Sequence, residues 1–228
     1  MENIVIFGTS DFSRLIYWYL KNDKRYNVLG FTAHNRYITN STFHLLPVYS
    51  FEELDKHLNE IDFKVLIAIG NSKMNRLRQA VFEECKSKGL QIASYFHPSS
   101  KINSQCMGEG NIIMENCILY PYSSIGENNL FWDNVVINHD CLIGSHNTFA
   151  GHSDLNGYSV IGNNCFIGKK AIIKEHIKIS DFSLIGAGVF CDFDTVDYDV
   201  VVPCRSHKLR NKKSIDLMWL IIFILLAS

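Results

Sequence analysis

Residues 135–162 read VVINHDCLIGSHNTFAGHSDLNGYSVIG, and the sixth-residue series Ile137, Ile143, Phe149, Leu155 and Ile161 runs through this stretch. The apolar period continues without a break from Met107 to Cys191. It is typical of a parallel β-helix in which three hexapeptides form one coil. We therefore predict a prism of stacked coils over residues 99–205, with the apolar stripe filling its interior.

A second column of mostly small side chains precedes each apolar residue by two positions. It comprises Cys117, Ser123, Cys141, Ser153, Ser159, Cys165, Ala171 and Ser183. We expect these side chains to fit where the coil tightens at its corners, and the cysteines to be core thiols. Glycine recurs every 18 residues at Gly108, Gly126, Gly144 and Gly162, where we expect it to tolerate the turn backbone. The period itself does not fix the hand of the coil.

Residues 1–98 follow a different pattern, in which strand and helix signals alternate. Strands are predicted at 3–7, 26–32, 64–69 and 91–96, and helices at 12–21, 50–59 and 73–88. We expect Asp11 to cap the first helix, and a capping box from Ser50 to Glu53 to open the second. The predicted fold class is thus α/β plus β: a small Rossmann-like parallel-sheet domain, then a parallel β-helix.

Composition excludes several classes of protein. The chain has 22 Lys+Arg and 23 Asp+Glu, a formal net charge of −1, which argues against a nucleic-acid binder. Seven cysteines without CxxC spacing favour reduced thiols over a disulfide framework or a structural metal site. No basic region precedes the first apolar run, which excludes a signal peptide there. We expect a cytoplasmic protein without a metal.

Residues 206–228 form a basic and then apolar tail. Lys208, Arg210, Lys212 and Lys213 precede the eleven apolar residues Leu217–Ala227. A bilayer crossing needs about 20 residues, so this run is too short to span one. It could make a peripheral membrane contact behind its basic flank, or pack on the prism or on a neighbouring subunit.

His139 and Asp140 are adjacent ionisable residues in the repeat region. Histidine is the usual general base in proton transfer, because its ordinary pKa is close to neutral pH. A neighbouring carboxylate can fix the tautomer of such a histidine. His139 lies two residues after the interior Ile137, so we expect it at a coil corner that faces outward. From the residues alone, a solvated corner histidine without a catalytic role explains the pattern equally well.

The order of domains, the string His97-Pro98-Ser99-Ser100 and the string Asn138–Gly144 (NHDCLIG) resemble the NeuD and PglD type of sugar acyltransferase. The resemblance covers roughly residues 2 to 205 and implies a left-handed coil. It also implies a homotrimer, with each active site between two subunits. It further implies acetyl transfer from acetyl-CoA, with His139 as general base and Asp140 as its orienting neighbour. The acceptor implied is a nucleotide-linked amino sugar for a bacterial surface glycan, or a hydroxyl of a sialic acid.

The resemblance also implies a groove for the pantetheine of acetyl-CoA along the coils. The corresponding positions are Gly157, Lys169, Gly186 and Ala187, with Lys169 and Lys170 available to the phosphates of CoA. Where this family carries a second histidine near the thioester, the chain has Thr148, so the resemblance also places Thr148 among the cofactor-binding positions. His146 and His152 flank Thr148, and either could take the place of that histidine.

The first βα turn, Gly8-Thr9-Ser10, is not GxGxxG, so a dinucleotide site is not expected. The turn precedes a helix and supplies hydroxyl donors, so it could hold the diphosphate of a sugar nucleotide. Gly70 and Asn71 follow the third predicted strand, at the edge where ligands of parallel sheets bind. We expect all five residues to contact a nucleotide-linked sugar.

Other functions remain open at this stage. A γ-class carbonic anhydrase would need three zinc-binding histidines, and the spacing of His139, His146 and His152 matches that pattern poorly. A nucleotidyltransferase would carry basic residues in its first turn, and a serine acetyltransferase would begin with helices. O-acetylation of a sugar hydroxyl and a non-catalytic trimeric scaffold are the remaining alternatives.

Overall fold

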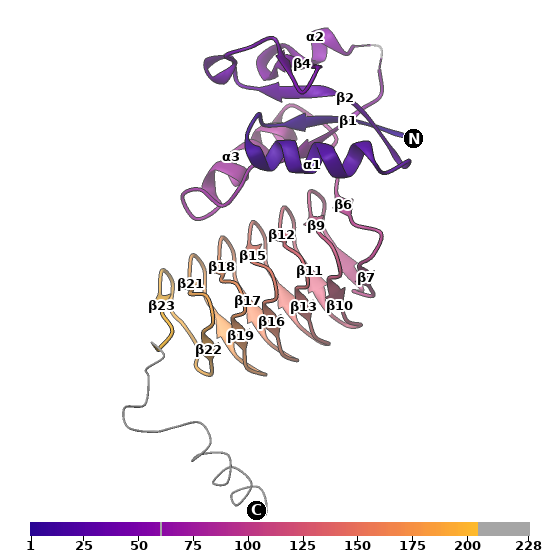
Figure 1. Cartoon of the computed structure of the whole chain (residues 1–228). Helices are drawn as coiled ribbons and strands as arrows, with labels where there is room; N and C mark the ends of the chain where they lie inside the picture. Colours follow the sequence, from indigo (N-terminus) through magenta and orange to yellow (C-terminus); the bar gives the residue numbers. More distant parts are fainter. Residues whose placement is uncertain (60, 205–228) are drawn as a thin grey trace, which may run out of the picture.

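The computed structural model describes residues 1–59 and 61–204, so the predicted tail lies outside the described residues. The N-terminal domain is a five-stranded sheet in the order β3-β4-β2-β1-β5. Figure 1 shows it standing on one side of a long prism. Its strands are β1 (Glu2–Phe7), β2 (Tyr26–Ala33), β3 (Thr42–Phe43), β4 (Leu46–Ser50) and β5 (Lys64–Ile67). Its helices are α1 (Asp11–Lys21), η1 (Asn35–Tyr37), η2 (Phe51–Glu53), α2 (Leu54–His57) and α3 (Arg76–Ser87).

Helix boundaries differ from the sequence predictions in three places. The capping box forms at α1, where Ser10 and Ser13 cap each other, while Asp11 lies in the first turn and pairs with Arg14. Ser50 makes no side-chain cap, and only the short η2 and α2 follow it. Helix α3 begins three residues later than predicted because Lys73, Met74 and Asn75 all have positive φ.

The strand predicted over 91–96 is divided between the two domains. Ile92 forms only an isolated bridge with Val65 of the N-terminal sheet. Tyr95–Phe96 is β6, which pairs with a strand of the prism. The hairpin β3–β4 was not predicted, and β4 extends the parallel sheet beside β2.

The prism has three parallel sheets, whose strands repeat in the order of the coils (Figure 1). The covered sheet faces the N-terminal domain and contains β6, β9 (Ile112–Ile113), β12 (Leu130–Phe131), β15 (Thr148–Phe149), β18 (Phe166–Ile167), β21 (Leu184–Ile185) and β23 (Val200–Val201). The second sheet contains β7 (Lys101–Ile102), β10 (Ile118–Leu119), β13 (Val136–Ile137), β16 (Asp154–Leu155), β19 (Ile172–Ile173) and β22 (Phe190–Cys191). The third contains β8 (Cys106–Met107), β11 (Ser124–Ile125), β14 (Leu142–Ile143), β17 (Val160–Ile161) and β20 (Lys178–Ile179).

We number the corners of the prism by the sheets they join. The first corner joins the covered and second sheets, the second corner joins the second and third sheets, and the third corner joins the third and covered sheets. Left-handed backbone recurs at all of them, for example at Lys170, Asp140 and His146.

The interior matches the predicted apolar stripe. Every stripe residue from Ile113 to Cys191 is buried, and Met107 is partly buried at the first coil.

Buried asparagines occupy the small column at three positions before Cys165, at intervals of 18 residues. Asn111, Asn129 and Asn147 form a ladder in which each side-chain oxygen accepts the backbone N–H one coil further on.

The glycine column has a different cause from the one predicted. Gly126 and its equivalents do not have positive φ, and the left-handed positions of this third corner carry residues such as Asn128 and His146 instead. A Cβ built on Gly126 would lie 2.6 Å from the carbonyl oxygen of Gly144. Glycine is therefore required because successive coils approach closely at this corner.

The two domains share a continuous core. Ile112 and Leu130 of the covered sheet pack with Ile4, Ile16 and Leu20 of the N-terminal domain. Among residues 1–59 and 61–204, no helix has the length and apolar character that a bilayer crossing requires.

Candidate active site

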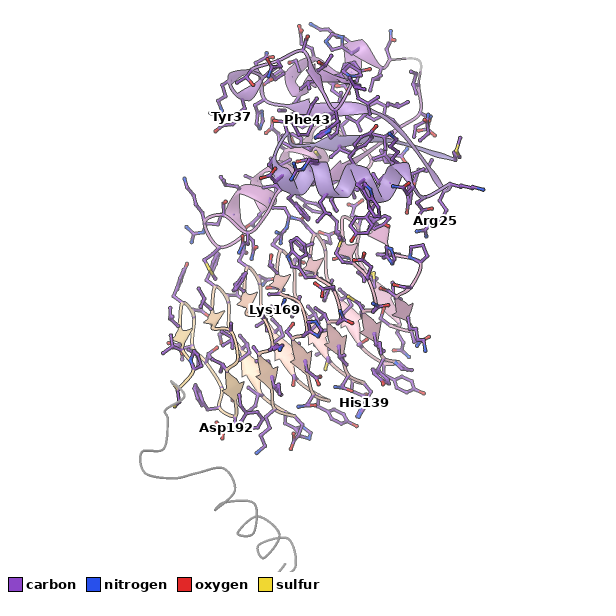
Figure 2. All side chains as sticks on the ribbon, in the orientation of Figure 1. Arg25, Tyr37, Phe43, His139, Lys169 and Asp192 are labelled. Atoms are coloured by element: carbon purple, nitrogen blue, oxygen red, sulfur yellow. The ribbon has the colours of Figure 1, made fainter. Side chains whose placement is uncertain are left out.

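His139 follows β13 at the second corner and points outward, as predicted (Figure 2). Its Nδ1 lies 2.8 Å from Oδ2 of Asp140. The side chains are 54% and 36% exposed, so a ligand or a second subunit can reach them. Asp140 adopts left-handed backbone with φ of 58°, which turns its carboxylate back toward the preceding imidazole.

The His139 ring is held by the next coil. It lies over Gly157 and meets Tyr158 edge to face, with ring centroids 5.4 Å apart. Tyr158 in turn stacks on His176, one coil further on, at 4.9 Å. The imidazole therefore has one face on backbone and one edge on an aromatic ring.

This geometry defines which nitrogen of His139 is basic. A carboxylate accepts hydrogen bonds, so Asp140 favours the tautomer in which Nδ1 carries the proton. Nε2 is then unprotonated and free to accept a proton from a nucleophile. The pair can also stabilise the imidazolium that such a transfer creates.

The outward faces on both sides of His139 are largely apolar. Ile172 and Phe190 of the second sheet and Leu142 of the third sheet are exposed. Asp154 stands among the outward residues of the second sheet, in register between Val136 and Ile172. Burial raises the pKa of Asp154, and its Oδ1 accepts a hydrogen bond of 3.1 Å from Nδ2 of Asn138.

The predicted acetyl-CoA residues fall into two groups. Gly157 lies directly against His139 at the second corner. Lys169, Gly186 and Ala187 follow β18 and β21 and lie at the first corner, where Lys169 and Ala187 are exposed. Figure 2 shows Lys169 and His139 apart on the prism. One protomer therefore does not bring these two groups together.

Thr148 corrects one prediction. It is 1% exposed, and its hydroxyl bonds to Asn75 and Arg78 of the N-terminal domain, so no face of it is left for a cofactor. The outward position on the covered sheet explains this burial. Neither flanking histidine stands near His139: His146 packs on Phe82 at the third corner, and His152 faces Asp133 at the first.

A cavity of about 380 Å³ lies at the carboxyl ends of β1, β2 and β5. Four of the five residues predicted to contact the substrate line it, namely Gly8, Thr9, Ser10 and Gly70, whereas Asn71 is not part of its lining. Gly8 has φ of 122°, and a Cβ there would lie 2.5 Å from Oγ of Ser13. That hydroxyl donates to the carbonyl of Ala68 and closes the turn.

The rim of this cavity carries residues that the sequence analysis did not assign. His34, Arg36 and Tyr37 follow β2 and line it, and its lining contains no Asp or Glu. His34 is held by Glu52, at 3.2 Å from Nδ1. Burial opposes ionisation of Glu52, but hydrogen bonds from backbone amides and from Ser50 lower its pKa to about 2. Glu84 also contacts His34, at 3.4 Å from Nε2, so the cation that the lining offers to an anion is Arg36. The signal in the sequence was the placement of His34 and Arg36 at a strand's carboxyl end.

In the part of the chain that the structure describes, no cluster of three or more His, Cys, Asp or Glu side chains could hold a metal ion. The fold defines a class of protein in which a Rossmann-like domain precedes a β-helix of hexapeptide repeats. In this chain a histidine, His139, stands at a corner of that β-helix.

Residues 3–85 match the sequence model of the family described as PglD N-terminal domain. This match confirms the resemblance to the PglD type over the N-terminal domain. No curated protein matches the chain by sequence.

Three solved structures show the same two-domain arrangement. The acetyltransferase domain of PglB from Neisseria gonorrhoeae, solved with acetyl coenzyme A, has a TM-score of 0.74 and 19% identity, over 87% of this chain and 95% of that one. A histidine-to-alanine mutant of GDP-perosamine N-acetyl transferase from Caulobacter crescentus, with CoA and GDP-perosamine, has a TM-score of 0.77 and 22% identity, over 88% and 93%. WeeI from Acinetobacter baumannii has a TM-score of 0.74 and 21% identity, over 89% and 97%.

At these identities the likeness establishes the fold. The chain is a small Rossmann-like domain followed by a left-handed parallel β-helix, as the sequence and its resemblance predict.

Proposed function

We propose that this protein is an acetyltransferase that moves acetyl from acetyl-CoA to the amine of a nucleotide-linked amino sugar. The observation that carries the proposal is His139, a corner imidazole whose Nδ1 is held by Asp140 and whose Nε2 is free. The likeness to sugar N-acetyltransferase structures supports the choice of reaction. The product would enter bacterial surface glycan synthesis, such as that of an O-antigen, from the cytoplasm.

The reaction needs one base. As the amine nitrogen attacks the thioester carbonyl, its proton passes to Nε2 of His139, and Asp140 stabilises the resulting imidazolium. The carbon–sulfur bond breaks, and the proton returns from His139 to the sulfur of CoA. Backbone N–H groups at the coil corners are the candidate donors for the carbonyl oxygen as it gains charge.

A homotrimer would complete this site. The base lies at the second corner, while Lys169, Gly186 and Ala187 lie at the first, on the other side of the second sheet. The exposed side chains of Ile172, Phe190 and Leu142 supply apolar surface for contact between copies. A neighbouring copy could bring its first corner to His139, with Lys169 and Lys170 facing the phosphates of acetyl-CoA.

The N-terminal cavity would hold the nucleotide. The turn Gly8–Ser10 lies at the start of α1, whose dipole favours an anion. Arg36 adds positive charge at the rim, and neither Asp nor Glu lines the cavity. A nucleoside diphosphate has the charge that this cavity is suited to.

The test is thiol release from acetyl-CoA with a panel of UDP-, dTDP- and GDP-linked amino sugars, and with sialic acid. We expect turnover with one amino-sugar nucleotide, and its loss by about 100-fold or more in His139→Ala. His57→Ala, at an exposed histidine of the N-terminal domain outside the cavity lining, is the matched control and should keep its activity. Turnover with sialic acid alone would establish O-acetylation instead. No turnover with any acceptor, from a protein shown to be trimeric, would favour the scaffold.

A further inference from the structure

Arg78 is a buried cation at the junction of the two domains. Its side chain is 2% exposed, and none of its described partners is a carboxylate. Burial lowers its pKa to about 9, which still leaves the guanidinium protonated at neutral pH. A buried charge without a counterion is costly unless hydrogen bonds satisfy it. Its retention therefore calls for an explanation beyond packing.

The guanidinium is satisfied from both domains. On the prism side it donates to the carbonyls of Asn128, His146 and Asn147, at 3.3, 3.2 and 2.8 Å. Nη1 also lies 3.2 Å from Oγ1 of Thr148. On the N-terminal side, Nη1 donates to the carbonyl of Gly70 at 3.3 Å. The planar fork of arginine can make such a set of bonds in fixed directions, which an ammonium cannot.

Gly70 belongs to the cavity proposed for the nucleotide, and the segment after it is anchored a second time. Asn75 is fully buried in left-handed backbone, just before α3. Its Oδ1 accepts from Thr148 at 2.7 Å, and its Nδ2 donates to the carbonyl of Cys165 at 3.0 Å. The turn between β5 and α3 is thus held to the prism indirectly at Gly70, through Arg78, and directly at Asn75.

We propose that Arg78 is a positioning residue that fixes the Gly70 turn of the nucleotide cavity to the β-helix, with Thr148 as its partner. The role rests on the proposed function, because a nucleotide in that cavity is held at a set position relative to the coils. Binding energy from such a remote group is useful only if the two sites keep their spacing. Thr148, in place of the second histidine that the resemblance implies, serves this attachment.

The exposed end of α3 provides a matched control. Lys86 also joins α3 to the prism, through ion pairs of 2.7 Å with Glu109 and 3.1 Å with Glu127. It lies two helical turns beyond Arg78 and touches no residue of the cavity. A general weakening of the domain junction would affect Lys86→Met and Arg78→Met alike, whereas a positioning role would affect Arg78→Met alone.

The first measurement needs no substrate. Hydrogen–deuterium exchange compares wild type with Arg78→Met, Thr148→Val and Lys86→Met in the full chain. Faster exchange of residues 66–76 in the first two variants, with unchanged exchange over 155–185, supports the proposal. Unchanged exchange of 66–76 in both overturns it. Thr148→Val keeps the side-chain shape, so it remains informative if Arg78→Met does not fold.

The second measurement is kinetic. With the acceptor found by thiol release, we expect Arg78→Met to raise the KM for the nucleotide sugar about 10-fold, with the KM for acetyl-CoA unchanged. Arg78→Lys should recover part of this loss, and Lys86→Met should match wild type. Equal changes in both KM values, or the same change in Lys86→Met, would make Arg78 a structural residue only. If wild type shows no turnover, the proposed function fails while the exchange result still decides the attachment.

Discussion

The imidazole of His139 lies directly on the backbone of Gly157, one coil further along the prism. A Cβ at position 157 would come within 2.9 Å of Cε1 and 3.1 Å of Nε2. Nε2 is the ring nitrogen that does not contact Asp140, so Gly157 controls where the basic nitrogen points. The resemblance assigned Gly157 to cofactor binding, and the structure gives it a second reason to be glycine.

Gly157→Ala should therefore lower kcat by about 10- to 100-fold, because the added methyl group displaces the imidazole from its position. Gly157 does not have positive φ, so alanine adds no backbone strain. The melting temperature should stay close to that of wild type. Steady-state kinetics and a thermal melt check this, and an active Gly157→Ala enzyme would show that the ring position is not critical.

Asp140→Asn tests the orientation of His139. Asparagine also tolerates the left-handed backbone at this position, where φ is 58°. Its amide can donate to Nδ1, which would leave the proton on Nε2 and remove the base. We expect kcat to fall about 10-fold or more, with little change in either KM. Asp181→Asn, on another corner, is the control for loss of a surface carboxylate, and full activity of Asp140→Asn would contradict the assigned tautomer.

Lys169 and Lys170 are expected to act on acetyl-CoA alone. Both are exposed at the first corner, where an anionic phosphate could meet them. Replacing both by alanine should raise the KM for acetyl-CoA about 3- to 10-fold, since exposed charge contacts contribute about 1 kcal/mol. The KM for the acceptor should not change. Lys56→Ala, on the N-terminal domain, controls for the loss of positive charge. A change in the KM for the acceptor alone would show that Lys169 and Lys170 do not bind acetyl-CoA.

The prism was predictable because its period is a direct consequence of its geometry. Each coil returns to the same corner after 18 residues, so an interior position repeats in the sequence whatever its neighbours are. The hairpin β3–β4 offered no such signal. Its turn places His44 and Leu45 at φ of 49° and 68°, where Gly or Asn would normally mark it.

The sequence carries a signal of the buried arginine. Arg78 occupies a helical stripe with Val81, Phe82 and Cys85, all buried, at the spacing of one face of α3. A cation in that stripe indicates an interface with backbone acceptors, although the sequence could not show which ones. The acetyl-CoA residues carried a similar signal. Lys169 follows His139 by 30 residues, which is not a multiple of 18, so the period already assigns the two residues to different corners, whereas Gly157 follows His139 by 18.

The domain junction should weaken in mild acid through His146. Burial, and then the nearby charge of Arg78, lower the pKa of His146, while Glu83 and Glu127 act against them. The neutral imidazole accepts from Nδ2 of Asn128 at 2.9 Å. A group with a depressed native pKa contributes stability above its unfolded pKa, about 6.5, and loses it as the pH falls through the native value.

The melting temperature of wild type should therefore fall between pH 7.5 and 5.5, and it should fall less steeply in His146→Gln. His152→Gln, an exposed histidine at another corner, is the matched control and should keep the wild-type slope. Differential scanning calorimetry at fixed ionic strength measures all three. If the melting temperatures of His146→Gln and wild type fall equally with pH, other groups take up the protons that destabilise the fold in acid. The domain junction then does not respond to pH through His146.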